Sequence, residues 1–302
     1  MSFDDANWAT LISRIQHGQC MPIIGAGASF PRLPLGDELA RELKKILTKH
    51  SPPEWANLEQ VAEYINVESK DGSRAKEAAA EYINNRLRRP VENAAADPHV
   101  TLAQLAQPIY LTTNYDNLLK QAFGDREIVR ETCRWNSTLL NLRSAMDGKY
   151  EPTRAKPLVF HLHGLTEMPK SMVLSEDDYL DFLVNLSRDL ASVPKRPMLP
   201  ICVRDALKNF TLLFVGYSLK DINFRVILRG LLGPLLPSER CMSLTVQFHN
   251  SGSTSPEEEA RLRAYLEEYF GWTMRLQVYW GTASDFMREL QTRLAAPPAE
   301  SP

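Results

Sequence analysis

Short, largely apolar runs recur along the chain and alternate with segments of helical periodicity. Runs that are apolar on both faces are typical of strands buried in a parallel sheet. In the segment 36–47, Leu39, Leu43 and Leu47 recur at every fourth position after a candidate helix cap at Asp37. The alternation predicts an α/β fold with a parallel sheet and helices on both of its faces. The expected strands are 21–24, 109–112, 158–162, 212–215, 242–248 and 274–279.

The spacing of these runs predicts helical insertions in a single domain. About 85 residues separate the first two strands, and their pattern is helical throughout, so we expect an insertion at about 37–107. A second one is expected at about 175–208, where Ser175 stands three residues before Asp178 as in a capping box. The domain is expected to cover 1–296, and 297–302 to form a disordered tail.

Composition excludes several classes of protein. The formal net charge of −2 provides no general attraction to nucleic acid or to anionic lipid, so neither is an expected direct partner. The four cysteines form no CxxC pair, which argues against a zinc ribbon. The N-terminus is acidic where a signal peptide needs basic residues, and the longest apolar runs are too short to span a membrane. We therefore expect a cytoplasmic protein.

The stretch GAGASF at 25–30 follows the first expected strand. Gly25 and Gly27 lack a Cβ, so a phosphate could approach the backbone N–H groups of this turn. A dehydrogenase fingerprint needs a third glycine at position 30, where this chain has Phe30. From these residues alone, a tight turn with no ligand stays open.

Polar residues follow the second strand in TTNYD. Thr113, Asn114 and Asp116 stand at the carboxyl end of a strand, where ligands bind in open α/β sheets. The alternative is that Asp116 only caps the next helix and Asn114 only forms the turn.

Two later strands end in HLHG and VGYS. His161 is flanked by Phe160 and Leu162, which indicates a core residue, whereas His163 at the strand exit is the better chemical candidate. The second motif supplies Gly216, Tyr217 and Ser218; because Lys220 replaces the second glycine of a nucleophile elbow, serine hydrolysis is disfavoured.

GAGAS, TTNYD, HLHG and VGYS occur in this order, and with VLSEDDYLDF and VYWGTASDFMREL the chain resembles the sirtuin family. The resemblance is to the sirtuin-like branch found in bacterial antiphage defence, and it covers about 12–294. It implies a Rossmann-like sheet that binds NAD in an inverted manner relative to dehydrogenases. Classical deacylases of the family carry a zinc module with two CxxC pairs, which this sequence lacks, so we expect no zinc and a lower chance of deacylation.

The resemblance also implies roles for individual residues. Asn114 and Asp116 fall in the nicotinamide and ribose pocket, and His163 takes the place of the sirtuin catalytic histidine. Thr113 is expected to bind NAD as well. The other residues expected to bind NAD are Gly25, Ala26, Gly27 and Ser29 at the phosphates, Phe30 in a mobile loop over the nicotinamide ribose, Gly216, Tyr217 and Ser218 on the adenosine side, and Trp280 with Gly281 at the adenine.

The expected activity is hydrolysis of NAD to ADP-ribose and nicotinamide in antiphage defence, with Asn114, His163 and Asp116 as the catalytic set. The alternatives are an NAD or ADP-ribose sensor without turnover, and a protein deacylase or ADP-ribosyltransferase. Because unrestrained NAD hydrolysis would kill the host and the expected domain fills the chain, we expect control by assembly. The expected assemblies are a homo-oligomer and a complex with a HerA-type ATPase translocase, or alternatively with an Argonaute-type partner.

Overall fold

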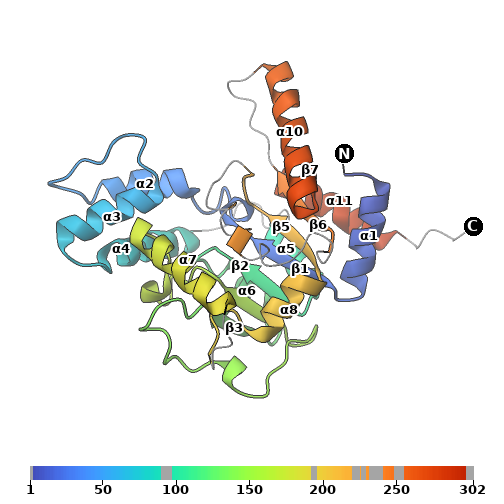
Figure 1. The fold of residues 1–302 in the computed structure, drawn as a ribbon, viewed down its shortest axis with the longest axis horizontal. Helices are drawn as coiled ribbons and strands as arrows, with labels where there is room; N and C mark the ends of the chain where they lie inside the picture. The colour runs from blue at the N-terminus through green and yellow to red at the C-terminus, as the bar shows by residue number, and fades with distance from the viewer. Residues whose placement is uncertain are drawn as a thin grey trace, which may run out of the picture.

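The computed structural model describes residues 3–89, 97–191, 196–219, 225, 229–230, 241–247 and 255–296. Within these ranges, seven parallel strands form one sheet in the order β3-β4-β2-β1-β5-β6-β7 (Figure 1). The strands are β1 (Cys20–Ile24), β2 (Ile109–Thr112), β3 (Val129–Thr132), β4 (Leu158–His161), β5 (Thr211–Val215), β6 (Ser243–Gln247) and β7 (Leu276–Trp280).

All six expected strands are present, with small shifts at their ends. The run at 242–248 becomes β6, and Phe248 lies outside the described residues. The run at 274–279 starts two residues too early, because a helix continues through Met274. β3 is not among the expected strands. This strand lies at the edge of the sheet and is half-buried along its length, so its positions can hold polar residues. Arg130 and Glu131 occupy two of them and interrupt the apolar pattern.

Helices cover both faces of the sheet, as expected for an α/β protein. On one face α7 (Glu176–Leu190), α8 (Ile201–Asn209) and part of α10 (Pro256–Met274) pack on side chains such as Ile23, Leu111 and Phe214. The opposite face takes α1 (Asp5–Gln16), α5 (Pro98–Gln104), α6 (Leu118–Phe123) and α11 (Ala283–Ala295). In Figure 1 α7 and α8 lie in front of the sheet, and α10 projects from the body.

The first insertion forms a helical layer at one side of the sheet. It contains α2 (Gly36–Lys44), α3 (Leu58–Ser69) and α4 (Arg74–Leu87), whose apolar faces form a separate core with Met172 and Leu174. The cap expected at Asp37 is wrong, because α2 begins one residue earlier and Leu35 is its N-cap; Asp37 lies in the first turn. The capping box of Ser175 and Asp178 at the start of α7 is confirmed.

Short 3-10 turns connect some of these elements. They are η1 (Ala26–Ala28), η3 (Ala145–Asp147) and η4 (Pro169–Ser171). The expected tail, 297–302, lies outside the described residues.

Candidate functional site

The order of the strands indicates where a ligand would bind. β1 lies between β2 and β5, and the chain leaves β1 toward one side of the sheet and β5 toward the other. Such a switch point opens a crevice at the carboxyl ends of the two strands, where open α/β sheets bind ligands. GAGAS follows β1 and VGYS ends β5, so both motifs stand at this point.

The two glycine motifs pack directly against each other. The N–H groups of Gly25 and Gly27 donate to the carbonyls of Val215 and Gly216, both at 2.9 Å. Gly216 has φ +84°, and a Cβ there would lie 2.2 Å from the backbone nitrogen of Ala28. These glycines therefore serve the close approach of two backbones. Within 25–29, Ala26 is exposed, and its N–H donates to no group of the described residues.

Asn114 is fixed in one orientation at this edge. Its side-chain Nδ2 donates to the carbonyl of Gly25 at 3.1 Å and to Oγ of Ser29 at 3.0 Å. Because the Gly25 carbonyl can only accept, the amide nitrogen must face it. The Oδ1 atom accepts no hydrogen bond from the described residues, although the side chain is buried. Asn114 thus keeps an unused acceptor at the carboxyl end of β2.

Asp116 precedes α6, whose N-cap is Asn117, so the expected cap is one residue away. Its Oδ1 accepts from the backbone N–H of Leu118, the first residue of α6, at 2.9 Å. Its Oδ2 accepts from Oγ of Ser29 at 3.0 Å. Since Ser29 also accepts from Asn114, the three side chains form one chain of hydrogen bonds, and all three are buried. The Ser29 hydroxyl is therefore occupied inside the protein in this structure.

Tyr217 links the two strand ends on either side of β1. Its hydroxyl lies 2.9 Å from Oγ1 of Thr113 and donates to the carbonyl of Ile24 at 3.1 Å. Gln247 at the end of β6 holds the same loop, donating to the Tyr217 carbonyl at 3.1 Å and accepting from the N–H of Leu219 at 2.9 Å.

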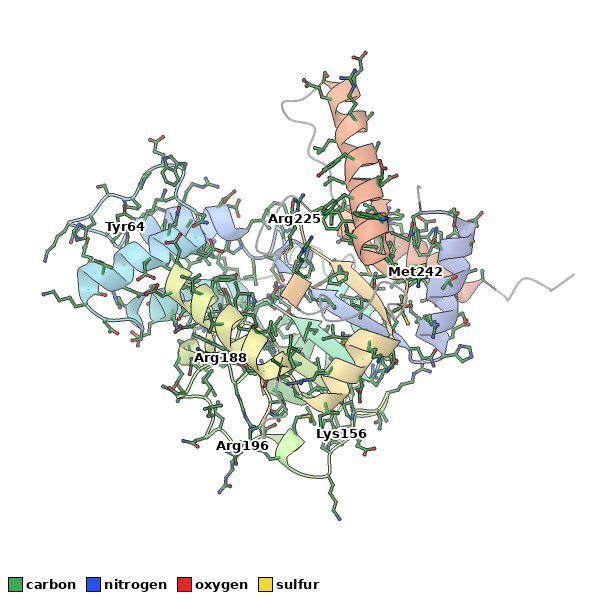
Figure 2. The ribbon with its side chains drawn as sticks, in the orientation of Figure 1. Tyr64, Lys156, Arg188, Arg196, Arg225 and Met242 are labelled. Carbon is green, nitrogen blue, oxygen red and sulfur yellow. The ribbon has the colours of Figure 1, made fainter. Side chains whose placement is uncertain are left out.

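Gln247 was not among the expected site residues, although a buried amide at the end of an apolar strand is an available signal. Arg225, labelled in Figure 2, adds a further support, since its Nε donates to the Leu219 carbonyl at 2.9 Å. Its guanidinium lies over the rings of Tyr269 and Phe270 of α10.

His163 is sequestered from solvent. It is 2% exposed, its ring makes edge contacts with Tyr179 and Phe182 of α7, and its Nε2 is buried with no partner among the described residues. Burial lowers the pKa of His163 to about 3, so the ring is neutral at pH 7. No hydrogen bond within the described ranges joins it to Asn114. The neighbouring His161 makes that link, with Nδ1 3.3 Å from the Asn114 carbonyl oxygen.

The remaining expected residues lie farther from this network. Phe30 is half-exposed directly after Ser29, and Ser218 is exposed beside Tyr217. Trp280 donates from its indole to Glu267 of α10 at 2.7 Å, and the guanidinium of Arg263 covers its ring. Gly281 bonds to the carbonyl of Gln247 through its N–H at 2.8 Å.

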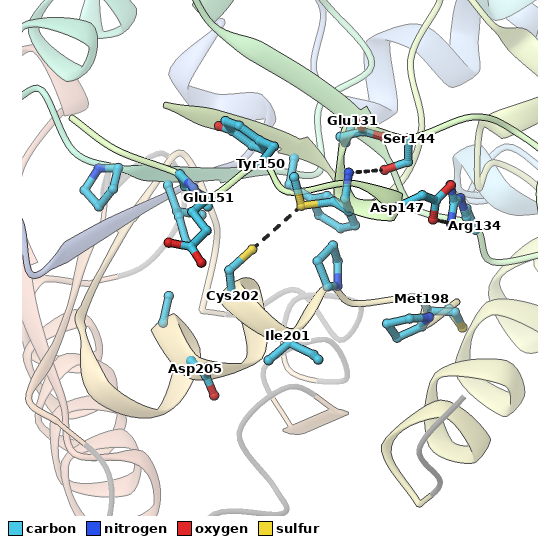
Figure 3. A pocket seen from close by; sticks show the side chains of 18 of the residues that line it. Glu131, Arg134, Ser144, Asp147, Tyr150, Glu151, Met198, Ile201, Cys202 and Asp205 are labelled. Atoms are coloured by element: carbon cyan, nitrogen blue, oxygen red, sulfur yellow. Dashed lines mark hydrogen bonds and ion pairs between the residues drawn. The ribbon is translucent and has the colours of Figure 1, made fainter. Parts of the chain in front are cut away.

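A cavity of about 860 Å³ opens elsewhere, between α8 and the segment that follows β3 (Figure 3). Its polar side chains are largely used within the wall: Arg134 forms two contacts with Asp147, at 2.7 and 3.0 Å, and burial raises the pKa of the Cys202 thiol. The cavity runs along the sheet from Pro108 and Phe210, which precede β2 and β5, to Thr132 at the end of β3, and Asn114 is not among its lining residues. Its size alone does not make it the site.

Across the part of the chain that the structure describes, no three His, Cys, Asp or Glu side chains are grouped as metal ligands. Among the helices in the same ranges, none combines the length and apolarity that a membrane crossing requires.

Two curated relatives carry the same description, "NAD(+) hydrolase ThsA". The one from Bacillus cereus (strain MSX-D12) is 28% identical over 130 residues, covering 43% of this chain and 23% of the relative. The one from Acinetobacter baumannii (strain 532279) is 24% identical over 219 residues, covering 72% of this chain and 40% of the relative. The chain thus spans less than half the length of either.

A solved structure described as "Structural Basis for the Mechanism and Regulation of Sir2 Enzymes" aligns over 96% of this chain and 98% of its own, with a TM-score of 0.42 and 10% identity. The family model described as "SIR2-like domain" matches residues 108–269, which run from β2 into α10 and include TTNYD, HLHG and VGYS. Because that match covers more than half of the chain, the protein belongs to the SIR2-like family.

Proposed function

We propose that the protein hydrolyses NAD⁺ at the bond between nicotinamide and ribose, releasing nicotinamide and ADP-ribose. The observation that carries the proposal is the Asn114 amide, whose nitrogen is fixed by two hydrogen bonds at the switch point of the sheet while its oxygen has no partner among the described residues. The description of both ThsA relatives as NAD(+) hydrolases supports the reaction. The pyrophosphate would lie against the loop at 25–29, where the Ala26 N–H is available.

The chemistry needs little acid catalysis. Nicotinamide leaves with the bonding electron pair and becomes neutral, water adds to the ribose carbon, and one proton passes to solvent. The ribosyl group carries positive charge in the transition state, so an unused acceptor such as Asn114 Oδ1 stabilises it or aligns the attacking water. Asp116 then acts through Ser29, because its carboxylate accepts from the Ser29 hydroxyl, which in turn accepts from the Asn114 amide.

His163 is proposed as a neutral hydrogen-bond partner of a ribose hydroxyl. With a pKa of about 3 it is a weak base while it stays between Tyr179 and Phe182. This burial also favours a second candidate function, an NAD or ADP-ribose sensor that binds without turnover. Incubating the purified protein with NAD⁺ and measuring nicotinamide separates the two, because only the hydrolase releases it.

Two substitutions test the site. Asn114→Ala and His163→Ala are expected to abolish nicotinamide release and to leave the far-ultraviolet circular dichroism spectrum unchanged. Matched controls are Asn209→Ala and His50→Ala, which change exposed residues outside the proposed site and should keep wild-type turnover. Wild-type turnover in either site variant would refute the assignment.

We also propose that this activity depletes NAD in antiphage defence and is gated by assembly. Leu180 and Val184 lie one turn apart on α7 and are 62% and 48% exposed, which supports a contact surface there. The proposed assemblies are a homo-oligomer and a complex with a HerA-type ATPase, or alternatively an Argonaute-type partner. Light scattering and nicotinamide release, each with and without the partner, test this. A monomer that is fully active alone would contradict it.

A further inference from the structure

His161, the last residue of β4, reaches the segment that carries Asn114. We propose that His161 is a positioning residue for Asn114, which it holds by the backbone carbonyl so that the amide oxygen keeps its place. This inference rests on the proposed function, since it gives His161 a part in the hydrolysis through Asn114. The first histidine of HLHG, His161, then serves the reaction, although its apolar neighbours in the sequence indicate a core residue.

The contact determines which ring nitrogen carries the proton. Nδ1 of His161 lies 3.3 Å from the carbonyl oxygen of Asn114. A carbonyl only accepts, so Nδ1 must donate, and in the neutral ring Nε2 is left with a lone pair. Burial, with a smaller contribution from the nearby Arg130, lowers the pKa of His161 to about 4, and the ring is therefore neutral at pH 7.

The other backbone groups of this segment are bound by different partners. The N–H of Thr113 donates to the Ile24 carbonyl at 3.0 Å, the N–H of Asn114 to Oγ1 of Thr112 at 3.0 Å, and the N–H of Thr166 to the Tyr115 carbonyl at 2.8 Å. These contacts fix the chain on both sides of Asn114. Among the described residues, the contact that reaches the Asn114 carbonyl itself comes from His161.

Stability does not explain a histidine at this position. Its Nε2 is buried with no partner among the described residues, and so is Oγ1 of Thr132, which is paired with His161 across β3 and β4. An unsatisfied buried acceptor destabilises the folded state relative to an apolar side chain of similar shape. Among the described residues, the one hydrogen bond made by the His161 side chain is to the segment of the site, so positioning is the function that the contacts support.

The test compares His161→Asn with His161→Leu. The side-chain amide of Asn can donate from the position of Nδ1, whereas Leu has a similar size and no donor. For nicotinamide release, we expect kcat to stay within about threefold of wild type in the Asn variant and to fall about tenfold or more in the Leu variant, with KM for NAD⁺ little changed in both. The melting temperature of the Leu variant should equal or exceed that of wild type.

A matched control is His99→Leu. His99 is also buried, but it bonds to Asp97 at the start of α5, so its loss should lower the melting temperature and leave kcat unchanged. Equal kcat in the Asn and Leu variants of His161, whether high or low, would overturn the proposal.

Nitrogen-15 NMR of the wild-type protein gives a readout that needs no activity and no variant. The Nδ1–H tautomer of His161 is expected from pH 6 to pH 8, and the opposite tautomer would also overturn the proposal, even if the Leu variant fails to fold. If the wild type releases no nicotinamide while the tautomer is as expected, the proposed function fails and the His161 contact stands.

Discussion

Replacing Ser29 by alanine tests the hydrogen-bond chain that orients Asn114. The substitution removes Oγ, which donates to Asp116 at 3.0 Å and accepts from Asn114 at 3.0 Å. Ser29 is 4% exposed, so water does not simply replace the lost hydroxyl. Both neighbours keep a second partner, Asp116 through the Leu118 N–H and Asn114 through the Gly25 carbonyl. Asp116 and Asn114 therefore each lose only one of their two hydrogen-bond partners.

The magnitude follows from these two bonds. A hydrogen bond to a carboxylate contributes about 1.5–3 kcal/mol and one between neutral groups about 0.5–1.5 kcal/mol. Because neither neighbour is left bare, we expect the lower part of the combined range, a decrease of about 2–3 kcal/mol in the free energy of unfolding. Asn114 also loses one of its two anchors, and a misalignment costing about 1.4 kcal/mol would lower kcat for nicotinamide release about tenfold.

Urea unfolding followed by circular dichroism, together with nicotinamide release, measures both effects of Ser29→Ala. Ser69→Ala is the matched control, because Ser69 Oγ donates to the Ile65 carbonyl at 2.7 Å near the end of α3, away from the switch point. It should cost about 1 kcal/mol at most and leave kcat unchanged. If Ser29→Ala matches this control in both measurements, the hydrogen-bond chain does not position Asn114.

Three further perturbations have expected outcomes. Gly216→Ala should prevent accumulation of folded protein, since φ is +84° and a Cβ would meet backbone at 2.2 Å; a soluble variant with wild-type melting temperature would contradict this. Lys76→Met breaks a buried ion pair with Asp178 (2.7 Å) and should lower the free energy of unfolding by about 3 kcal/mol in urea titrations. This is the low end of the range for breaking a buried ion pair, because Asp178 keeps its hydrogen bonds from two backbone N–H groups. Acidification should destabilise the fold, because the pKa values of His161 and His163 lie at about 4 and 3, below the value in the unfolded chain. The unfolded chain therefore binds more protons between about pH 6.5 and 4, and each histidine lowers the free energy of unfolding by up to about 1.4 kcal/mol per pH unit. A free energy of unfolding that stays constant from about pH 6.5 to 5 would refute this.

A strand of the sheet could be predicted from the sequence where its burial requires apolar side chains. β1 and β5 are buried at every position, which is why their apolar runs were visible. β3 was missed because an edge strand needs no apolar residues on both faces. The end of α10 was misjudged at Met274, since an apolar residue there suits a helix as well as a strand.

The candidate site divides in the same way. The polar residues of TTNYD could be placed at a strand end from the sequence, because the carboxyl ends of parallel strands share one edge of the sheet. The hydrogen-bond partners of these residues could not be predicted from the sequence. Ser29 and Asn114 are 85 positions apart, and only the pairing of β1 with β2 brings them within hydrogen-bond distance. Gln247 becomes a support of the Tyr217 loop for the same reason.

The sequence by itself determined the class of fold, the order of the motifs and the side-chain types available for chemistry, because apolar periodicity and residue type are local properties of the chain. Tertiary structure decided what each group does. The N–H groups of Gly25 and Gly27 join two loops, and the amide nitrogen of Asn114 faces the Gly25 carbonyl. His163 packs against α7, and His161 contacts the Asn114 carbonyl. These outcomes depend on which strands are neighbours and on which atoms remain unsatisfied after packing, and both are set by contacts between distant residues.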